Sequence, residues 1–313
     1  MTSNVIRIGS RGSVLALSQA DWVKQSLEKK YSHLKVAIKK IKTKGDKILG
    51  SPLAGIKGKG LFVKEIEDAL LREDIDMAVH SMKDVPTGIP AGLLLAAIPK
   101  REDIRDAFIS RDGLTFAKLP SGSRIGTSSL RRQAQIKNLR PDLLCETLRG
   151  NLDTRMRKLS EGKFDAIIVA MAGLKRLKME DKATEILSPE IFFPAIGQGA
   201  LAIESRADDS RINNCLAFLE HRPTRMAVAA ERSFLSRLGG GCQVPIAAHG
   251  MLDGNILSLS GIVLSEDGKV KVKDKIQGII MDVKSAEEIG KRLAEVLLSR
   301  GASDILSSRR SML

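Results

Sequence analysis

Residues 5–13 read VIRIGSRGS, an apolar strand pattern that ends in glycine and hydroxyl residues. An amphipathic helix is expected directly after it, from about Val14 to Lys29. The same pattern returns at residues 123–129, SRIGTSS, before a second helix that starts near Leu130. Another pair of segments recurs in the same order, DMAVHSM at 76–82 and DAIIVAM at 165–171. Each match spans only three or four residues, so chance is the competing explanation, but the shared order favours two α/β lobes of like design.

Strands that alternate with helices predict mostly parallel sheets, which bind ligands beyond the carboxyl ends of their strands. We therefore expect an α/β protein with two such lobes and a smaller α+β domain at the C-terminus. The α+β part is indicated by alternating strands near 255–264 and 269–279, joined by the hairpin turn SEDG at 265–268. A strand at 200–204 is expected to return to the first lobe. The predicted domains are residues 1–99 with 200–217, residues 105–193, and residues 222–313.

Composition narrows the class of protein further. The 313 residues are 43% apolar and 28% charged, as in soluble folded proteins. The net charge of +14 indicates an anionic partner, but aromatic residues make up only 3%, too few for the stacking that single-stranded nucleic acids require. Three distant cysteines and four histidines form no metal-ligand cluster, so no metal is expected. Without a signal core or a run of 18 apolar residues, a cytoplasmic protein with reduced thiols and no membrane association is expected.

The two strand-to-helix turns are candidate anion sites. Helix N-termini bind anions through unpaired N–H groups and the positive end of the helix dipole, and Arg11, Ser13 and Ser129 stand at these turns. The competing interpretation is that the two serines are N-caps. Arg131 and Arg132 oppose the dipole in the first turn of their helix, so they cost stability unless an anion compensates them. Arg149, Arg155 and Arg176 are further candidates for carboxylate or phosphate recognition, although Arg149 and Arg176 would also suit a plain surface.

Two further residues could take part in chemistry. Asp84 follows a predicted buried strand beside Lys83, where a carboxylate can move protons or stabilise a developing cation; a turn cap is the alternative. Cys242 follows the glycine run 239–241, which allows tight backbone and close ligand approach. A thiol on such a loop suits a nucleophile or an attachment point, whereas lone cysteines are more often packing residues. We assign the packing role to Cys145 and Cys215, and treat Cys242 as the exception.

Taken together, eight segments resemble those of the porphobilinogen deaminase (hydroxymethylbilane synthase) family, in order along the chain to about residue 250. They are RIGSRGSVLALSQA (7–20), GKGLFVKEIE (58–67), VHSMKDVP (79–86), GTSSLRRQAQ (126–135), LRGNLDTR (148–155), GLKRL (173–177), AIGQGALAIE (195–204) and AERSFLSRLGGGCQVP (230–245). The resemblance implies two periplasmic-binding-protein-like lobes and a transferase that deaminates porphobilinogen. It would join four molecules head to tail into hydroxymethylbilane, for porphyrin and heme biosynthesis. A dipyrromethane cofactor, bound to a cysteine by a thioether, would prime the growing chain.

The resemblance also implies roles for single residues, motif by motif. Cys242 would carry the dipyrromethane, and Asp84 would be the catalytic carboxylate near the pyrrole N–H groups. Residues expected around the cofactor are Ser81, Lys83, Thr127, Ser129, Arg131, Arg132, Gly150 and Arg155. Residues expected to face the substrate and the growing chain are Arg11, Ser13, Gln19, Arg149, Arg155 and Arg176. Lys59 and Phe62 would lie on or beside a mobile lid loop, expected at 43–60, and Gln198 on the crossing between the domains.

The implied activity accounts for the charge of the chain, because every pyrrole unit carries two carboxylates and the lengthening product is a polyanion. We expect a monomer whose partner is the small-molecule substrate porphobilinogen, with no nucleic acid. The competing class is a non-enzymatic, two-lobed protein that binds an anionic solute, since two α/β lobes with anion-binding helix starts describe both. An exported receptor would need a signal peptide and a regulator a helix-turn-helix module, and the sequence indicates neither.

Overall fold

The computed structural model describes residues 5–47, 60, 62–240 and 244–310. These fall into two compact units. The first unit comprises the chain up to Arg101 together with Ala200–Arg222, and the second comprises Glu102–Gly199 together with the chain from Pro223 onward. Each unit is therefore built from segments that are distant in the sequence.

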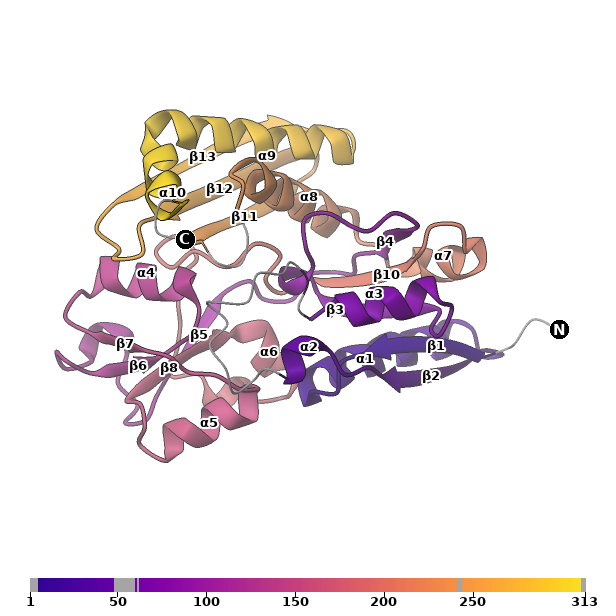
Figure 1. Ribbon diagram of the computed structural model, residues 1–313, viewed down its shortest axis with the longest axis horizontal. Helices are drawn as coiled ribbons and strands as arrows, with labels where there is room; N and C mark the ends of the chain where they lie inside the picture. Colours follow the sequence, from indigo (N-terminus) through magenta and orange to yellow (C-terminus); the bar gives the residue numbers. More distant parts are fainter. Residues whose placement is uncertain (1–4, 48–59, 61, 241–243, 311–313) are drawn as a thin grey trace. The chain divides into compact units, whose positions relative to one another are not determined.

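The first unit is organised around a five-stranded sheet in the order β2-β1-β3-β10-β4 (Figure 1). β1 pairs parallel with β2 and β3, whereas β10 runs antiparallel to β3 and β4. β10 comes last in the sequence, which confirms that the strand near residue 200 returns to the first lobe. The elements are β1 (Val5–Ser10), α1 (Val14–Lys30), β2 (Lys35–Lys40), α2 (Lys44–Lys47), α3 (Lys64–Leu71), β3 (Met77–Ser81), the 3-10 turn η2 (Met82–Asp84), β4 (Leu93–Ala97), β10 (Leu201–Arg206), α7 (Ser210–Leu216) and the 3-10 turn η5 (Ala217–Leu219).

The second unit repeats this plan in a sheet ordered β7-β6-β8-β5-β9. β6 pairs parallel with β7 and β8, and β5 runs antiparallel to β8 and β9. The reversed strand thus occupies the same place in both sheets. The elements are β5 (Asp106–Ser110), η3 (Phe116–Lys118), β6 (Arg124–Gly126), α4 (Leu130–Leu139), β7 (Leu144–Glu146), α5 (Leu152–Ser160), β8 (Ala166–Ala170), α6 (Met171–Arg176), η4 (Glu180–Lys182) and β9 (Glu185–Ile186).

The sequence repeat has a structural cause. The backbone N–H of Arg7 donates to the Asp76 carboxylate over 2.7 Å, and the Asp76 N–H donates back to the Arg7 carbonyl. Arg124 and Asp165 exchange the same two bonds in the second unit, the first also at 2.7 Å. Each aspartate stands just before β3 or β8, the strand that pairs with the strand of the arginine. The repeat therefore marks the closure of two adjacent strands, and the expectation of two lobes of like design is confirmed.

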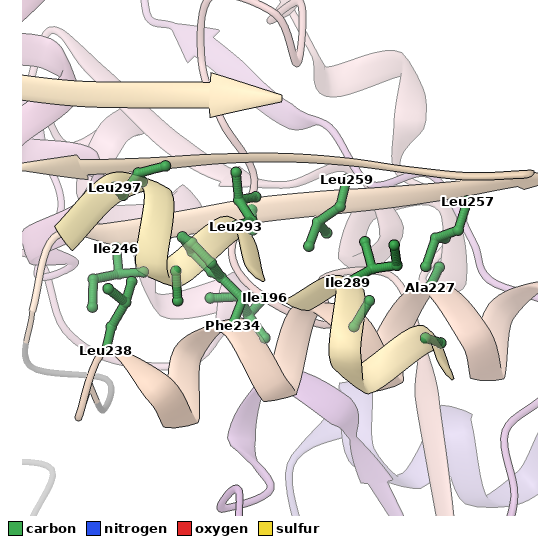
Figure 2. Packing of buried hydrophobic residues seen from close by; sticks show 14 of the residues in the cluster. Ile196, Ala227, Phe234, Leu238, Ile246, Leu257, Leu259, Ile289, Leu293 and Leu297 are labelled. Carbon is green, nitrogen blue, oxygen red and sulfur yellow. The ribbon is translucent and has the colours of Figure 1, made fainter. Parts of the chain in front are cut away.

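The C-terminal part of the second unit is an antiparallel sheet of β11 (Ile246–Asp253), β12 (Ile256–Leu264) and β13 (Lys271–Ile279). Helices α8 (Arg222–Arg237) and α9 (Val283–Leu297) bury an apolar cluster against this sheet (Figure 2). Gly261 on β12 permits the close packing, because a Cβ there would stand 2.7 Å from Cζ of Phe234. The chain then kinks at Arg300 and Gly301, whose backbone is not helical, and continues into α10 (Ser303–Arg310). The expected smaller α+β part is confirmed.

The sheets differ from the expectation in detail. One strand in each five-stranded sheet runs against the other four, so both sheets are mixed. Within the loop expected at 43–60, Lys44–Lys47 form α2, while residues 48–59 lie outside the described residues. β5 begins at Asp106, the last residue of the strongly charged stretch KREDIRD at 100–106. A charged first residue can belong to a buried strand because its charge is compensated, here by Arg131 and Arg132.

Candidate functional site

The turn after β1 holds an arginine and a serine in defined roles. Ser13 N-caps α1, since its side chain accepts a hydrogen bond from the Ala16 N–H at 3.3 Å, so the capping interpretation is confirmed for this residue. Arg11 donates through Nε to Asp46 Oδ1 over 3.1 Å, and its Cζ lies 4.2 Å from the centre of the Phe62 ring. Burial alone would raise the pKa of Asp46, but the hydrogen bonds and charge of Arg11, with bonds from Thr43, lower it below its usual value. Lys59, on the expected lid, lies outside the described residues.

Asp84 ends the short 3-10 turn η2 that directly follows the buried strand β3. Ser81, the last residue of β3, receives a hydrogen bond from Nε2 of the buried Gln19 on α1 over 3.1 Å. The Asp84 side chain is half-buried, and among the described residues none donates a hydrogen bond to its carboxylate. This carboxylate therefore does not act as a turn cap here. Within the described part of the chain, no donor would compete with a ligand for this half-buried acid.

In the turn before α4, the hydroxyl residues are used differently. Ser129 occupies the N-cap position, but its side chain makes no capping hydrogen bond, so the capping interpretation is wrong for this residue. Instead, the Ser129 N–H donates to Oγ1 of Thr127 over 3.2 Å. Thr127 is completely buried, and Nε2 of Gln133 donates to its carbonyl at 2.9 Å. The half-buried hydroxyl of Ser129 therefore lies at the N-terminus of α4 without capping it.

Arg131 and Arg132 are buried, and the anion that compensates them belongs to the protein itself. Arg131 Nη1 donates to Asp106 Oδ2 at 2.8 Å, and Arg132 donates to Oδ1 through Nη2 at 2.6 Å and Nε at 3.2 Å. Arg132 Nη1 also donates to the carbonyl of Ile168. Burial alone would raise the pKa of Asp106, but the charges and hydrogen bonds of the two arginines hold it far below its usual value. Two guanidinium groups and one carboxylate leave this buried cluster with a net positive charge.

Gln198 and Gln135 complete the surroundings of this cluster. Gln198 is fully buried and donates from Nε2 to Asp106 Oδ1 at 3.1 Å and to the carbonyl of Ile104 at 2.8 Å. The Phe193 N–H donates to Oε1 of Gln135, whose Nε2 donates back to the Phe193 carbonyl. The sequence resemblance places Gln198 on a crossing segment but does not point to Asp106, whose one signal is an aspartate at the head of an apolar stretch, DAFIS.

The segment after β7 brings Arg149, Gly150 and Arg155 together. Gly150 has φ +112°, and a Cβ there would stand 2.7 Å from Cγ2 of Thr154, so this backbone requires glycine. Arg155 donates from Nε to the Gly150 carbonyl over 2.9 Å, which ties the first turn of α5 to the glycine. Arg149 is half-buried, and Nζ of Lys158 donates to its carbonyl at 3.5 Å. The three residues thus form one compact turn.

Arg176, at the end of α6, lies at the segment that joins the two units. Its Nη2 donates to the Gly199 carbonyl at 2.6 Å, and the Glu102 N–H donates to the same carbonyl at 3.2 Å. Burial lowers the pKa of Arg176 to about 10. Since the cost of burying its charge is what lowers this pKa, an anion beside the guanidinium would be bound favourably.

Two of the three cysteines lie in the described part of the chain, and both have the packing role that the sequence predicts. Cys145 and Cys215 are partly buried and pack against apolar clusters, and burial raises the pKa of the Cys145 thiol. Both packing assignments are confirmed. Cys242 itself lies outside the described residues, but Gly239 and Gly240 before it are constrained. Gly239 has φ +65°, and a Cβ on Gly240 would stand 2.5 Å from Cδ1 of Ile246.

These groups suit recognition of carboxylates and acid–base chemistry. The second unit offers the net positive Arg131–Arg132–Asp106 cluster, the Ser129 hydroxyl and Arg155, and the first offers Arg11, Lys83 and Asp84. Within residues 5–47, 60, 62–240 and 244–310, no group of histidine, cysteine, aspartate or glutamate is arranged to hold a metal ion. No helix in these ranges is long and apolar enough to cross a membrane.

Two family models match the chain. One, described as "Porphobilinogen deaminase, dipyromethane cofactor binding domain", covers residues 6–214, and the other, "Porphobilinogen deaminase, C-terminal domain", covers residues 225–299. The porphobilinogen deaminases of Geobacter sulfurreducens and Geobacter metallireducens are 56% and 57% identical to this chain over 307 residues, which is 98% of this chain and 95% of each relative. That of Trichlorobacter lovleyi is 55% identical over 306 residues, 98% of this chain and 97% of the relative.

Comparison with solved structures finds partial likenesses at low identity. A periplasmic binding protein of Salmonella typhimurium with high arginine specificity has a TM-score of 0.41 and 14% identity, covering 69% of this chain and 92% of its own. The periplasmic aliphatic sulphonate binding protein of Escherichia coli has a TM-score of 0.40 and 15% identity, covering 75% of this chain and 70% of its own.

Proposed function

This chain belongs to the porphobilinogen deaminase family, and we propose that the carboxylate of Asp84 and the thiol of Cys242 carry its chemistry. The enzyme is a transferase that deaminates porphobilinogen and joins four molecules head to tail into hydroxymethylbilane, a step of porphyrin and heme biosynthesis. Its cofactor is a dipyrromethane, which when bound supplies the terminal pyrrole to which the first unit is joined. The two-lobed solute-binding alternative is not favoured, because the family match covers both lobes.

The residues of the second unit suit this cofactor chemically. A dipyrromethane with acetate and propionate side chains carries four carboxylates, and the Arg131–Arg132–Asp106 cluster holds a buried net positive charge. We propose that Arg131, Arg132, Arg155 and the Ser129 hydroxyl receive these carboxylates, with Gly150 shaping the turn beside them. Thr127 is fully buried, so it would act by holding the turn rather than by contact. Cys242 would hold the cofactor through a thioether, and Ser81 and Lys83 would complete its surroundings.

Asp84 is proposed to act on the pyrrole nitrogen of the substrate. Loss of ammonia from the aminomethyl group leaves positive charge spread from that carbon to the ring N–H. A carboxylate that accepts a hydrogen bond from this N–H stabilises the charge and can hold a proton during the exchange. The observation that carries this role is the half-buried Asp84 carboxylate, which accepts no hydrogen bond from the described residues.

The remaining basic groups are proposed to bind the substrate and the lengthening chain. Arg149 and Arg176 would face carboxylates of the incoming unit, and Arg155 would serve both cofactor and substrate. Arg11 would do so by exchanging its bond with Asp46 for a substrate carboxylate. Ser13 and Gln19 would support these groups, since the first caps α1 and the second holds Ser81. We assign Lys59 and Phe62 to a lid, and Gln198 to the crossing.

We further propose a monomer in the cytoplasm that binds no nucleic acid, with three domains at residues 1–99 with 200–217, 105–193 and 222–313. The proposal on nucleic acid rests on the small aromatic content and on basic residues that a carboxylate-rich product explains. At low salt, duplex DNA should bind only weakly, and at moderate salt it should dissociate. Tight, sequence-selective binding at physiological salt would contradict it.

Intact mass spectrometry tests the attachment of the cofactor. The purified protein should exceed its sequence mass by one dipyrromethane, mapped to the peptide of Cys242. Cys242→Ser should fold without the excess mass, because a hydroxyl does not readily form the corresponding ether, whereas Cys145→Ser and Cys215→Ser should keep it. A full excess in Cys242→Ser would move the attachment to another cysteine.

A further inference from the structure

The first unit buries three titratable side chains that the proposed chemistry does not use. They are His80 on β3, Glu204 on β10 and Glu67 on α3, with exposed fractions of 6%, 0% and 8%. The His80 ring Nε2 lies 3.0 Å from Oε2 of Glu204. The other oxygen of Glu204 and Oε1 of Glu67 have no hydrogen-bond partner in the described part of the chain. Burying these groups is costly, so the cluster calls for an explanation.

The His80–Glu204 pair is a diagonal bond between two antiparallel strands. In the register of β3 and β10, His80 stands opposite Ala202, while Glu204 stands opposite Ala78. A diagonal side-chain bond is sensitive to register, since sliding one strand along the other changes its length. The pair therefore pins β3 against β10 along the strand direction.

The pinned position is the end of β3, from which the catalytic segment leaves the sheet. The ladder ends one residue after His80, where Ser81 stands opposite Leu201, and the Met82 N–H then donates to the Ala200 carbonyl at 3.0 Å. Asp84 follows within one 3-10 turn. Any shift of β3 along β10 would therefore be passed to Asp84 through three residues of tightly turned backbone.

Stability alone does not account for the pair, because well-packed apolar residues of similar volume are often as stabilising as a buried ion pair or more so. Glu67 provides the contrast within the same cluster. Its pKa is raised by burial first and by the negative charge of Glu204 second, and is lowered by the electrostatic interaction with His80, so Glu67 shares this interior, yet it makes no hydrogen bond to β3. One acid of the cluster is hydrogen-bonded to the strand that leads to Asp84 and the other is not.

We propose that His80 and Glu204 are positioning residues for the reaction, which fix the register of β3 and thereby the place of the Asp84 carboxylate. The inference rests on the proposed role of Asp84. A misplacement of about 1 Å can lower the rate about a hundredfold when a reacting group must meet its partner at short range. Binding of the substrate carboxylates depends on arginines outside this pair, so the Michaelis constant should be preserved.

The test compares kcat and KM of holoenzyme variants whose cofactor content has been equalised by mass. Glu204→Gln should lower kcat by about ten- to a hundredfold with little change in KM. Glu67→Gln is the matched control, of the same residue type and burial, and should keep the kcat of the parent. A kcat of Glu204→Gln within about twofold of the parent would overturn the proposal, by the same argument.

A double apolar variant separates position from stability. The double variant His80→Phe with Glu204→Leu should have an unfolding midpoint closer to that of the parent than Glu204→Gln has, since the buried charges are gone. Its kcat should nevertheless stay low. Recovery of kcat in this variant would show that the pair only fills space. Asp84→Asn, measured alongside, distinguishes the two proposals: if it is inactive while Glu204→Gln is fully active, only the positioning inference fails. If Asp84→Asn itself keeps full activity, the proposed role of Asp84 fails.

Discussion

Replacing Asp106 should destabilise the second unit severely. Its carboxylate receives hydrogen bonds from Arg131, Arg132 and Gln198 and is completely buried. Asp106→Asn leaves two buried guanidinium groups without a counter-charge. Removing one partner of a buried ion pair costs about 3–5 kcal/mol, a large part of a total stability of about 5–15 kcal/mol. Asp106→Ala, which also removes the acceptor oxygens, should fall at the upper end.

The assay is urea unfolding followed by far-ultraviolet circular dichroism, with hydrogen exchange of the α4 peptide as a local readout. Asp112→Asn is the matched control, because Asp112 also pairs with an arginine but is largely exposed, and its free energy of unfolding should hardly change. Adding Arg132→Met to Asp106→Asn should recover part of the loss, since one buried positive charge is removed. Asp106→Asn with a free energy of unfolding within about 1 kcal/mol of the parent would refute the reasoning.

The same cluster sets a pH dependence and a cofactor yield. Because the folded pKa of Asp106 lies far below its unfolded value, its contribution is fully present above about pH 4 and is lost only as the pH falls through the lowered pKa. The free energy of unfolding should therefore fall less for Asp106→Asn than for the parent as the pH is lowered from about 4 into strong acid.

The variant should also be isolated mainly without cofactor, since its arginines lose their fixed orientation, and a normal holoprotein mass would contradict this.

Four further predictions follow from the geometry. Asp84→Asn, loaded with ready-made tetrapyrrole and confirmed by mass, should lose at least about a hundred- to thousandfold in turnover with unchanged thermal stability; activity within about tenfold of the parent would refute the catalytic role. Arg131→Leu should yield mostly apoprotein by mass, whereas Arg149 and Arg176 variants should keep the cofactor and turn over slowly; holoprotein from Arg131→Leu would count against this. Gly199→Ala should lower the unfolding midpoint more than Gly122→Ala, because both have positive φ but a Cβ on Gly199 would stand 2.4 Å from the Glu102 carbonyl oxygen, whereas Gly122 has open space; equal midpoints would refute it. Glu67→Gln should stabilise the protein by an amount that grows as the pH rises from the ordinary glutamate pKa through the raised pKa of Glu67 and is then constant, because the stability linked to that raised pKa is present at low pH and lost over this range; a gain confined to acid pH would contradict the sign.

Predictions from the sequence were accurate where neighbours along the chain determine the structure. The two strand–turn–helix openings and the hairpin turn at 265–268 depend on apolar periodicity, glycine and capping residues, all of which act over a few residues. The repeated Arg-Ile-Gly pattern correctly indicated two like sheets, since in both units the arginine and an aspartate close the same pair of strands. The family motifs, each short, pointed to the same family that the full-length comparison establishes.

Only the tertiary structure could decide which groups meet. The helix dipole argument shows that Arg131 and Arg132 need an anion, but it cannot say that Asp106, 25 residues away and on a reversed strand, supplies it. The two helix starts also have similar hydroxyl residues in the sequence but differ in structure, because Ser13 caps its helix and Ser129 does not. Local rules fix backbone preferences within a turn or two, whereas the partner of a buried charge is chosen by how distant strands pack, which no short stretch of sequence records.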